Sequence, residues 1–141
     1  MEITFPNKDK EQFSQLGIAA VILFGSRAQG VSRKGSDYDI GILLQDNRIL
    51  RYPDERSACY SILYDILSGA IQQLVNIDIV FLADAPAELQ MHVVNYGIVL
   101  YERVPYTFVR FKERVMLSYA DFAPYRELFH KMILARLTPW K

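Results

Sequence analysis

Two short segments of the chain carry residue types that could bind a phosphate and a metal ion. The first is Gly25-Ser26-Arg27-Ala28-Gln29-Gly30, which directly follows an apolar run. Gly25 lets the backbone turn sharply and lets a ligand come close. The hydroxyl of Ser26, which we expect to cap the turn, and the free N–H groups at a helix start can bind an anion, with Arg27 as a nearby cation. The segment predicts a phosphate site, and a plain turn with a capping serine is the alternative.

The second segment, Gly35-Ser36-Asp37-Tyr38-Asp39-Ile40, holds two carboxylates that are two residues apart. In a strand both side chains project from the same face, with Cα atoms about 6.6 Å apart. Carboxylate oxygens are ligands that Mg²⁺ prefers, together with phosphate oxygens and water. Asp37 and Asp39 therefore predict a site for one or two hard cations beside the phosphate site.

A third carboxylate, Asp78, interrupts the apolar run Ile77-Asp78-Ile79-Val80-Phe81-Leu82. An unpaired buried carboxylate is costly, so Asp78 should reach a metal, a cation or the edge of the sheet. We expect it to join Asp37 and Asp39 as a metal ligand and to accept the proton of an attacking hydroxyl. Apolar surroundings would raise the pKa of Asp78 and a metal charge would lower it. A plain strand-edge residue is the alternative.

Strands and helices alternate around these segments. Branched apolar runs predict strands, and apolar residues three or four apart predict helices. The predicted strands cover residues 18–24, 37–44, 77–83 and 98–101, and the predicted helices cover residues 8–16, 53–75, 85–96 and 106 onward. Pro124 should kink or divide the last helix. This order predicts an α/β or α+β fold, a small mixed sheet covered by helices. We expect residues 1–141 to form a single domain, with residues 106–141 as its C-terminal helical segment.

The composition limits the class of protein. Of the 141 residues, 51% are hydrophobic and 23% are charged, which is a globular composition. Sixteen Lys and Arg balance sixteen Asp and Glu, and this balance disfavours an extended nucleic-acid interface, which usually needs a positive excess. The single cysteine, Cys59, cannot form an internal disulfide, and no run approaches the ~20 apolar residues of a transmembrane helix. With no signal-peptide pattern at the N-terminus, we expect a cytoplasmic protein.

The two segments together match a known signature. Gly25-Ser26, ten residues, then Asp37-Tyr38-Asp39 resembles the Gly-Ser…Asp-x-Asp pattern of the polymerase-β-like nucleotidyltransferase superfamily, and Asp78 lies where its third carboxylate is expected. Within that superfamily, Gly-Ser-Arg-Ala-x-Gly, Ser-Asp-x-Asp-Ile and Ile-Asp-Ile-Val are similar to motifs of the MNT-type minimal nucleotidyltransferases. These are the antitoxins of HEPN–MNT toxin–antitoxin pairs.

The resemblance implies a polymerase-β-like fold and an Mg²⁺-dependent protein adenylyltransferase. Such an enzyme transfers AMP from ATP to a tyrosine of a cognate HEPN ribonuclease toxin and so neutralises it. The resemblance implies that the nucleotide is bound by Gly25, Ser26 and Arg27. It also implies that the catalytic residues, which are also the ligands of two Mg²⁺ ions, are Asp37, Asp39 and Asp78. ATP and the HEPN toxin are the implied partners, a hetero-oligomer with the toxin is compatible with this, and no membrane takes part.

Two other functions stay open from the residues alone. The first is a non-catalytic antitoxin that acts by binding and occluding the toxin. The second is a nucleotidyltransferase for a small molecule such as an aminoglycoside. That activity usually needs a further domain to hold the drug, and a chain of zero net charge attracts a polycation weakly.

The residues around the first segment also suggest simpler roles. Gly25 to Ser32 approaches the spacing of a P-loop, but Val31 stands where the phosphate-binding Lys should be. A P-loop NTPase is therefore disfavoured. Arg33 and Lys34 are expected to belong to a solvated loop, although they could add positive charge near the phosphates.

Other polar and aromatic residues suggest structural roles. His92 and His130 have no metal-ligand spacing, and we expect surface or helix-packing positions for both. Cys59 lies among helical apolar positions and should be packed. We expect most of the aromatic residues of the C-terminal region to be core, with a docking surface for a partner as the alternative, and these are Tyr119, Phe122, Tyr125, Phe129 and Trp140.

Overall fold

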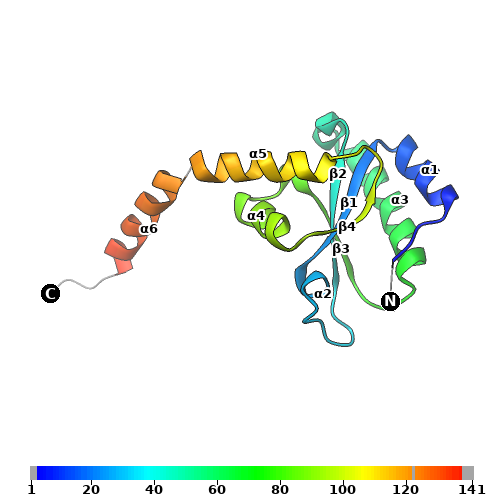
Figure 1. Ribbon diagram of the computed structural model, residues 1–141, viewed down its shortest axis with the longest axis horizontal. Helices are drawn as coiled ribbons and strands as arrows, with labels where there is room; N and C mark the ends of the chain where they lie inside the picture. Colours follow the sequence, from blue (N-terminus) through cyan, green and yellow to red (C-terminus); the bar gives the residue numbers. More distant parts are fainter. Residues whose placement is uncertain (1–2, 122, 138–141) are drawn as a thin grey trace.

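The computed structural model describes residues 3–121 and 123–137, without the side chains of residues 129, 133, 136 and 137. Its centre is a four-stranded sheet in the order β3-β2-β1-β4 (Figure 1). The strands are β1 (Ile18–Phe24), β2 (Tyr38–Leu44), β3 (Ile77–Phe81) and β4 (Ile98–Glu102). β1 pairs antiparallel with β2 and β4, whereas β2 and β3 are parallel. The predicted mixed sheet is confirmed.

Helices cover both faces of this sheet (Figure 1). α1 (Asn7–Gln15) and α3 (Pro53–Ile71) lie on one face, and α4 (Ala87–Tyr96) and the beginning of α5 (Thr107–Asp121) lie on the other. α3 is the crossover that a parallel pair of strands requires. The short helix α2 (Gly25–Gln29) directly follows β1, and α6 (Ala123–Leu137) follows α5.

Each face of the sheet has its own apolar cluster, because side chains alternate along the strands. On the α1/α3 face, Val21, Leu23 and Ile40 pack against Phe13 and Leu67. On the α4/α5 face the strands and helices contribute Ala20, Ile22, Phe24, Leu43, Leu82, Val93, Val94, Phe108, Phe111 and Val115. Cys59 is buried in the first cluster, as predicted.

The element boundaries differ most from the prediction at the ends of α3 and β3. The third helix ends at Ile71 rather than near Val75, because Gln72 adopts the left-handed conformation, with φ 56°. The following Leu74 is consequently exposed. β3 ends at Phe81 rather than Ala83, because a 3₁₀ turn (Leu82–Asp84) follows it. A second 3₁₀ turn (Asn47–Arg51), which the sequence analysis missed, follows β2.

The two C-terminal helices project from the sheet, and we call α5 and α6 the arm (Figure 1). The root of the arm is anchored by the buried side chains of Phe108, Phe111 and Val115, as their helical spacing predicted. Pro124 is the second residue of α6, a first-turn position that accepts proline. Figure 1 shows α6 running at an angle to α5, in agreement with the kink or division expected near this proline, and residue 122 between the two helices lies outside the described residues.

The expectation of an aromatic core in the C-terminal region is wrong for Tyr125, which is largely exposed. Tyr119 is half-buried. Phe122 and Trp140 lie outside the described residues, as does the side chain of Phe129. Among the residues that the structure describes, no helix is both long enough and apolar enough to cross a membrane.

Candidate active site

The segment that begins at Gly25 and the pair Asp37 and Asp39 meet where β1 ends and α2 begins. Phe24, the last residue of β1, is the cross-strand partner of Asp39. The next residue, Gly25, has φ +74°, and a Cβ atom at this position would overlap the Asp39 carboxylate. Glycine is therefore required here both for the backbone conformation and for the space that the carboxylate occupies. This close approach joins the two sequence segments into one site.

Asp78 comes to the same place through the parallel pairing of β2 and β3. Asp39 and Asp78 are direct register partners, so their side chains project from the same face of the sheet on neighbouring strands. Asp37 precedes β2 by one residue and is exposed, as is Asp78, whereas Asp39 is half-buried between them. We call Asp37, Asp39 and Asp78 the carboxylate cluster.

The electrostatics of Asp39 reflect this crowding. Burial raises the pKa of Asp39 above its ordinary value, and the negative charges of Asp78 and Asp37 raise it further. The nearby His92 has the opposite, weaker influence on the pKa of Asp39. A bound cation would relieve the repulsion among the carboxylates.

The carboxylate cluster fits the chemistry of Mg²⁺ binding completed by a substrate. Within residues 3–121 and 123–137, no three His, Cys, Asp or Glu side chains form a group that could by itself hold a metal ion. Mg²⁺ usually takes one or two protein carboxylates and completes its shell with substrate phosphates and water. The half-buried Asp39, whose carboxylate occupies the space left by the missing Gly25 side chain, suits that partial coordination.

The role predicted for the Ser26 side chain as a cap is not observed. α2 begins at Gly25 with Phe24 as its N-cap residue, and no side chain caps it. Ser26 is the second residue of the helix, and its carbonyl accepts a hydrogen bond from the N–H of Val31 at 3.1 Å. Ser26 is half-buried and lies directly after Gly25, so it remains a candidate phosphate ligand.

Arg27 connects α2 to the loop that carries Asp37. Its Nη2 donates a hydrogen bond to the carbonyl of Ser36 at 2.9 Å, and its Nε donates to the same oxygen at 3.3 Å. The guanidinium also lies 4.3 Å from the centroid of the Tyr38 ring. These contacts hold the two segments of the site together, a positioning role that the sequence analysis missed. Arg33 and Lys34 are exposed on the loop, as expected.

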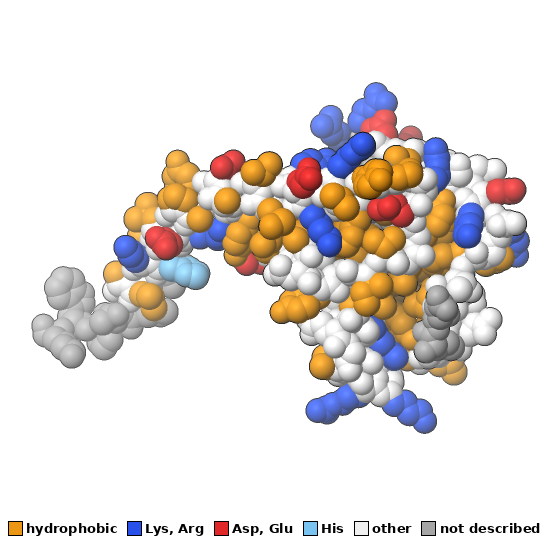
Figure 2. All heavy atoms as spheres, in the orientation of Figure 1, with side chains coloured by type: hydrophobic (Ala, Val, Ile, Leu, Met, Phe, Trp, Pro, Cys, Tyr) orange, Lys and Arg blue, Asp and Glu red, His pale blue; other side chains and the backbone are white. Residues whose placement is uncertain are grey.

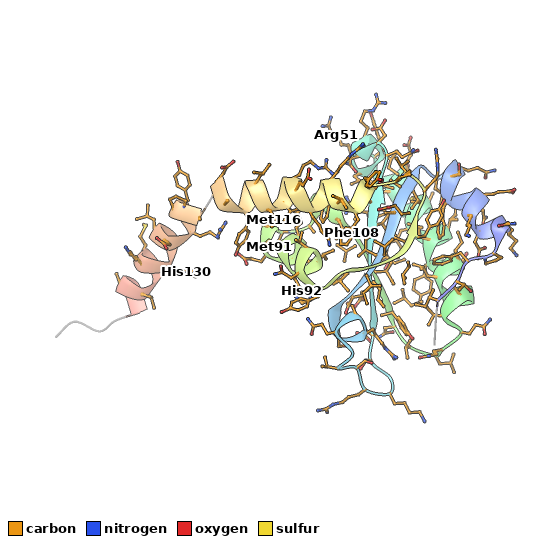
Figure 3. The ribbon with its side chains drawn as sticks, viewed as in Figure 1. Arg51, Met91, His92, Phe108, Met116 and His130 are labelled. Carbon is orange, nitrogen blue, oxygen red and sulfur yellow. The ribbon has the colours of Figure 1, made fainter. Side chains whose placement is uncertain are left out.

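His92 is a residue of the site that the sequence analysis had assigned to packing or the surface. It lies on α4, half-buried, and packs between Phe24 and Tyr96, with ring centroids 6.3 Å and 5.1 Å away (Figure 3). It packs against Phe24, the cross-strand partner of Asp39, and this contact places it near the carboxylate cluster. No spacing in the sequence relates His92 to the aspartates, because the packing of α4 on the sheet brings them together.

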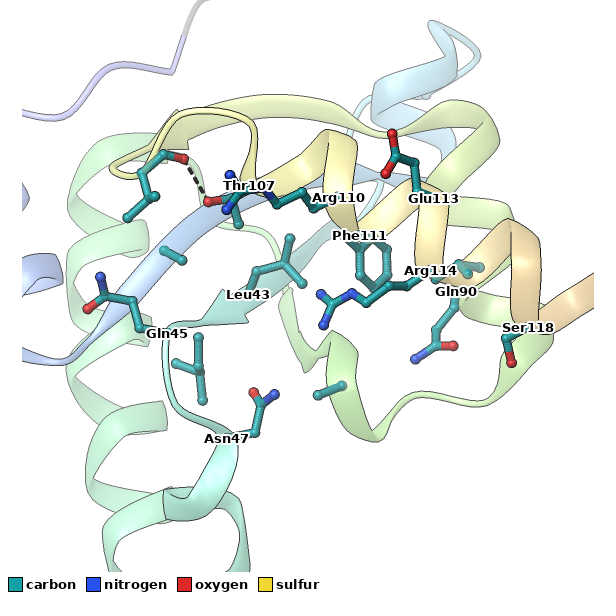
Figure 4. Close-up of a pocket in the computed structure, with 15 residues that line it drawn as sticks. Leu43, Gln45, Asn47, Gln90, Thr107, Arg110, Phe111, Glu113, Arg114 and Ser118 are labelled. Carbon is teal, nitrogen blue, oxygen red and sulfur yellow. Dashed lines mark hydrogen bonds between the residues drawn. The ribbon is translucent and has the colours of Figure 1, made fainter.

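A cavity of about 850 Å³ lies on the same face of the sheet but at the opposite end of β2, beneath α5 (Figure 4). Its floor includes Leu43 and Phe111, and its rim includes Arg110 and Arg114 of α5. None of the residues that line it belongs to the carboxylate cluster. We call this cavity the groove.

Comparison with known families agrees with the site's geometry. The family model described as polymerase beta, nucleotidyltransferase matches residues 7–106, which include every residue of the candidate site. The chain belongs to this nucleotidyltransferase family. The match ends at the residue before the arm, so the matched segment comprises the sheet and α1 to α4. No curated protein matches the sequence.

Solved structures share the nucleotidyltransferase fold with this chain. A chain of a toxin–antitoxin complex with AMP-PNP has a TM-score of 0.66 and 23% identity, covering 91% of this chain and 97% of that one. A chain from the tri-AMPylated Shewanella oneidensis HEPN toxin in complex with MNT antitoxin has a TM-score of 0.60 and 20% identity, with coverages of 91% and 94%. A chain of an MntA–HepT toxin–antitoxin structure has a TM-score of 0.58 and 18% identity, with coverages of 92% and 99%. At these identities the likeness establishes the fold.

Proposed function

We propose that this nucleotidyltransferase is an antitoxin that transfers AMP from ATP to a tyrosine of a HEPN-family toxin and thereby neutralises it, with Mg²⁺ required. The observation that supports this reaction is the placement of Gly25 against the Asp39 carboxylate, with Asp37 and Asp78 beside it. The choice of nucleotide and partner is supported by the similar folds, which come from toxin–antitoxin complexes, one with AMP-PNP and one with a tri-AMPylated toxin.

In this reaction the acceptor hydroxyl oxygen forms a bond to the α-phosphorus of ATP. The bond from that phosphorus to the bridging oxygen of the β-phosphate breaks, and pyrophosphate leaves with the electron pair. A carboxylate oxygen of Asp78 accepts the proton of the hydroxyl. Mg²⁺, held by Asp37, Asp39 and Asp78, would neutralise charge on the attacking and leaving oxygens.

The remaining residues of the site bind and orient the nucleotide. Ser26 and the first N–H groups of α2 hold the phosphates, and Gly25 keeps that backbone close to Asp39. Arg27 adds positive charge while its hydrogen bonds to Ser36 keep the Asp37 loop next to α2. Preorganised donors of this kind contribute to catalysis because they need no rearrangement during the reaction.

The test is to incubate the purified chain with ATP, Mg²⁺ and the HEPN-family protein encoded beside it, and to weigh that protein by intact mass spectrometry. We expect a gain of one or more AMP masses, located on a tyrosine by peptide fragmentation. The matched variant Asp37→Asn/Asp39→Asn keeps the side-chain shapes and removes two charges, so it should bind the toxin and leave its mass unchanged.

A stable complex without any gain in mass would contradict the reaction and favour an antitoxin that acts by occlusion. The same conclusion would follow if the Asp37→Asn/Asp39→Asn variant protected cells from the toxin as well as the native chain at equal abundance. Transfer of AMP to an aminoglycoside but not to the toxin would indicate a small-molecule enzyme instead.

A further inference from the structure

The arm exposes apolar side chains that nothing in the described chain covers. On α5, Met116 and Leu117 are 52% and 68% exposed, and on α6, Leu128 and Met132 are 55% and 49% exposed. Leu128 and Met132 are four residues apart and therefore lie on one face of the helix. None of the described side chains of α6 is buried.

A helix of this kind needs a partner. α6 has 15 residues, and isolated helices shorter than about 12–15 residues are marginal in water, because most helical stability in proteins comes from tertiary packing. The body of the protein, residues 3–106, offers α6 no apolar cluster, since both clusters end at residues of α5 or earlier. Within the described part of the chain, Leu128 and Met132 of α6 therefore present an apolar face that a partner could cover.

The direction of the arm is set at the junction of its two helices. The Arg126 guanidinium of α6 lies 3.4 Å from the centroid of the Tyr119 ring on α5. The Tyr119 hydroxyl in turn donates a hydrogen bond to Glu88 of α4, at 3.1 Å. These contacts tie the start of α6 to α4, the helix that carries His92. Figure 2 shows hydrophobic side chains along the arm and a hollow between the arm and the body.

The charge of the arm indicates what kind of surface would cover it. α5 and α6 contain six Lys or Arg and three Asp or Glu, so the rest of this neutral chain carries the compensating negative excess. In the groove, the guanidinium groups of Arg110 and Arg114 form no hydrogen bond or ion pair with residues 3–121 or 123–137. Figure 4 shows both side chains extending over the groove. Guanidinium groups of this kind bind carboxylates in pairs of parallel hydrogen bonds.

We propose that the arm and the groove are the docking surface for the protein that accepts AMP, and that this partner contributes an acidic surface with apolar anchors. Its carboxylates pair with Arg110 and Arg114, and its apolar side chains cover Leu128 and Met132. This inference rests on the proposed function, because it assigns the surface to the acceptor of the carboxylate cluster. The groove and the cluster lie on one face of the sheet at opposite ends of β2, so a partner docked at the arm must extend along this face to bring its acceptor hydroxyl to the carboxylate cluster.

Two other occupants fit the observations less well. An RNA would suit the basic residues, but half-exposed Leu and Met side chains add nothing to phosphate binding. A second copy of the chain would bring its own Arg110 and Arg114 to a symmetric contact at the groove, where like charges repel. An acidic protein surface satisfies both the charge and the apolar side chains.

The experiment compares two arm variants with one matched control, all in the full-length chain. Arg110→Glu/Arg114→Glu reverses two exposed charges in the groove, and Lys8→Glu/Lys10→Glu makes the same charge change on α1, across the sheet. Leu128→Ser/Met132→Ser removes the apolar anchors without changing charge. Thermal unfolding checks that each variant folds, and calorimetry measures the Kd for the HEPN-family protein of the transfer assay.

We expect each arm variant to raise the Kd, and the KM for the toxin, by about 10-fold or more, while kcat at saturating toxin stays within about twofold. The control should bind like the native chain. Unchanged binding in both arm variants would overturn the proposal. It would also be overturned if the chain alone formed a dimer that the same substitutions break, or if the arm variants lost binding to RNA and kept their affinity for the toxin.

The same data separate this inference from the proposed function. If the native chain binds the toxin through the arm but transfers no AMP, the reaction is wrong and the docking surface stands. If AMP is transferred and the arm variants keep the native KM, the reaction stands and the docking surface is wrong. If the native chain neither binds nor modifies the toxin, both fail.

Discussion

The body buries its apolar side chains in two clusters, whereas the outer part of the arm exposes apolar side chains to solvent. In the body, Ile22, Leu67 and their neighbours are fully buried, in two clusters that cover both faces of a sheet. Among the described residues of the arm, Val115 is the last that is buried, and outer side chains such as Leu117 and Leu128 are more than half exposed. A helix with exposed Leu and Met on a chain that has already completed its own core indicates an interaction site.

The comparison also separates chemistry from recognition. Every residue of the candidate active site belongs to the body, within the segment that the nucleotidyltransferase family shares. The arm lies outside that segment and holds none of these residues. Substitutions in the body should therefore change the reaction or the stability, and substitutions in the arm should change partner binding.

The largest effect should come from the centre of the carboxylate cluster. We expect Asp39→Asn to reduce AMP transfer by about 10³-fold or more, a loss of roughly 4 kcal/mol of transition-state stabilisation. The Asp39 carboxylate is the one that lies against Gly25, and Asp78 is its cross-strand partner, so its loss removes the charge at the centre of the site. Single-turnover kinetics at saturating toxin measure this loss. A toxin Kd that changed with it would show that the body also takes part in docking.

The next largest effect is on stability, and it should differ between the body and the arm. Ile22→Ala should lower the free energy of unfolding by about 3 kcal/mol, because it leaves a cavity in a fully buried cluster. Leu128→Ala should change it by less than about 0.5 kcal/mol in the chain alone. Urea denaturation of both variants measures the difference. A large loss for Leu128→Ala would mean that α6 is packed within the free chain.

Two glycine variants test the geometry of the candidate active site within the body. Gly25 and Gly30 both have φ +74°, but a Cβ atom would overlap Asp39 at Gly25 and would meet nothing within 4 Å at Gly30. Backbone strain alone should cost about 1 kcal/mol for Gly30→Ala. Gly25→Ala should cost roughly 2 kcal/mol and also impair nucleotide turnover, because it displaces the Asp39 carboxylate. If Gly25→Ala and Gly30→Ala lost the same stability and kept the same activity, the close approach of Gly25 to the Asp39 carboxylate would be contradicted.

The smallest effect concerns pH and should be confined to the body. The pKa of Asp39 is raised in the folded protein. At a pH below its ordinary pKa the carboxyl is protonated and its full contribution to the free energy of unfolding is present. This contribution is lost as the pH rises through the raised pKa and the carboxyl ionises. In a chelating buffer at pH 7, Asp39→Asn should therefore melt a few degrees above the native chain. The difference in melting temperature between the variant and the native chain should disappear as pH falls through the range in which carboxylates become protonated. Mg²⁺ should reduce the same difference, because it stabilises the native chain. A difference independent of pH would show that charge is not its cause.

Local patterns predicted much of this structure. The unbroken apolar run at residues 18–24 is β1 at its predicted bounds, and the alternation around Asp37 and Asp39 places both carboxylates at one end of β2. These predictions succeed because burial imposes a period on neighbouring residues. The end of α3 was mispredicted because Gln72 takes a left-handed conformation that its residue type does not favour.

Local sequence patterns were therefore sufficient to place the strands, most of the helices and the residue types that could bind phosphate and metal. The packing of the folded chain places the Asp39 carboxylate against Gly25, ties Arg27 to the carbonyl of Ser36, and sets His92 against Phe24, the strand partner of Asp39. It also places α5 and α6 outside the body and leaves Tyr125 largely exposed. The reason is physical: the period of a helix or strand is set by near neighbours, whereas these contacts join residues that come together only when the strands pair and the helices pack.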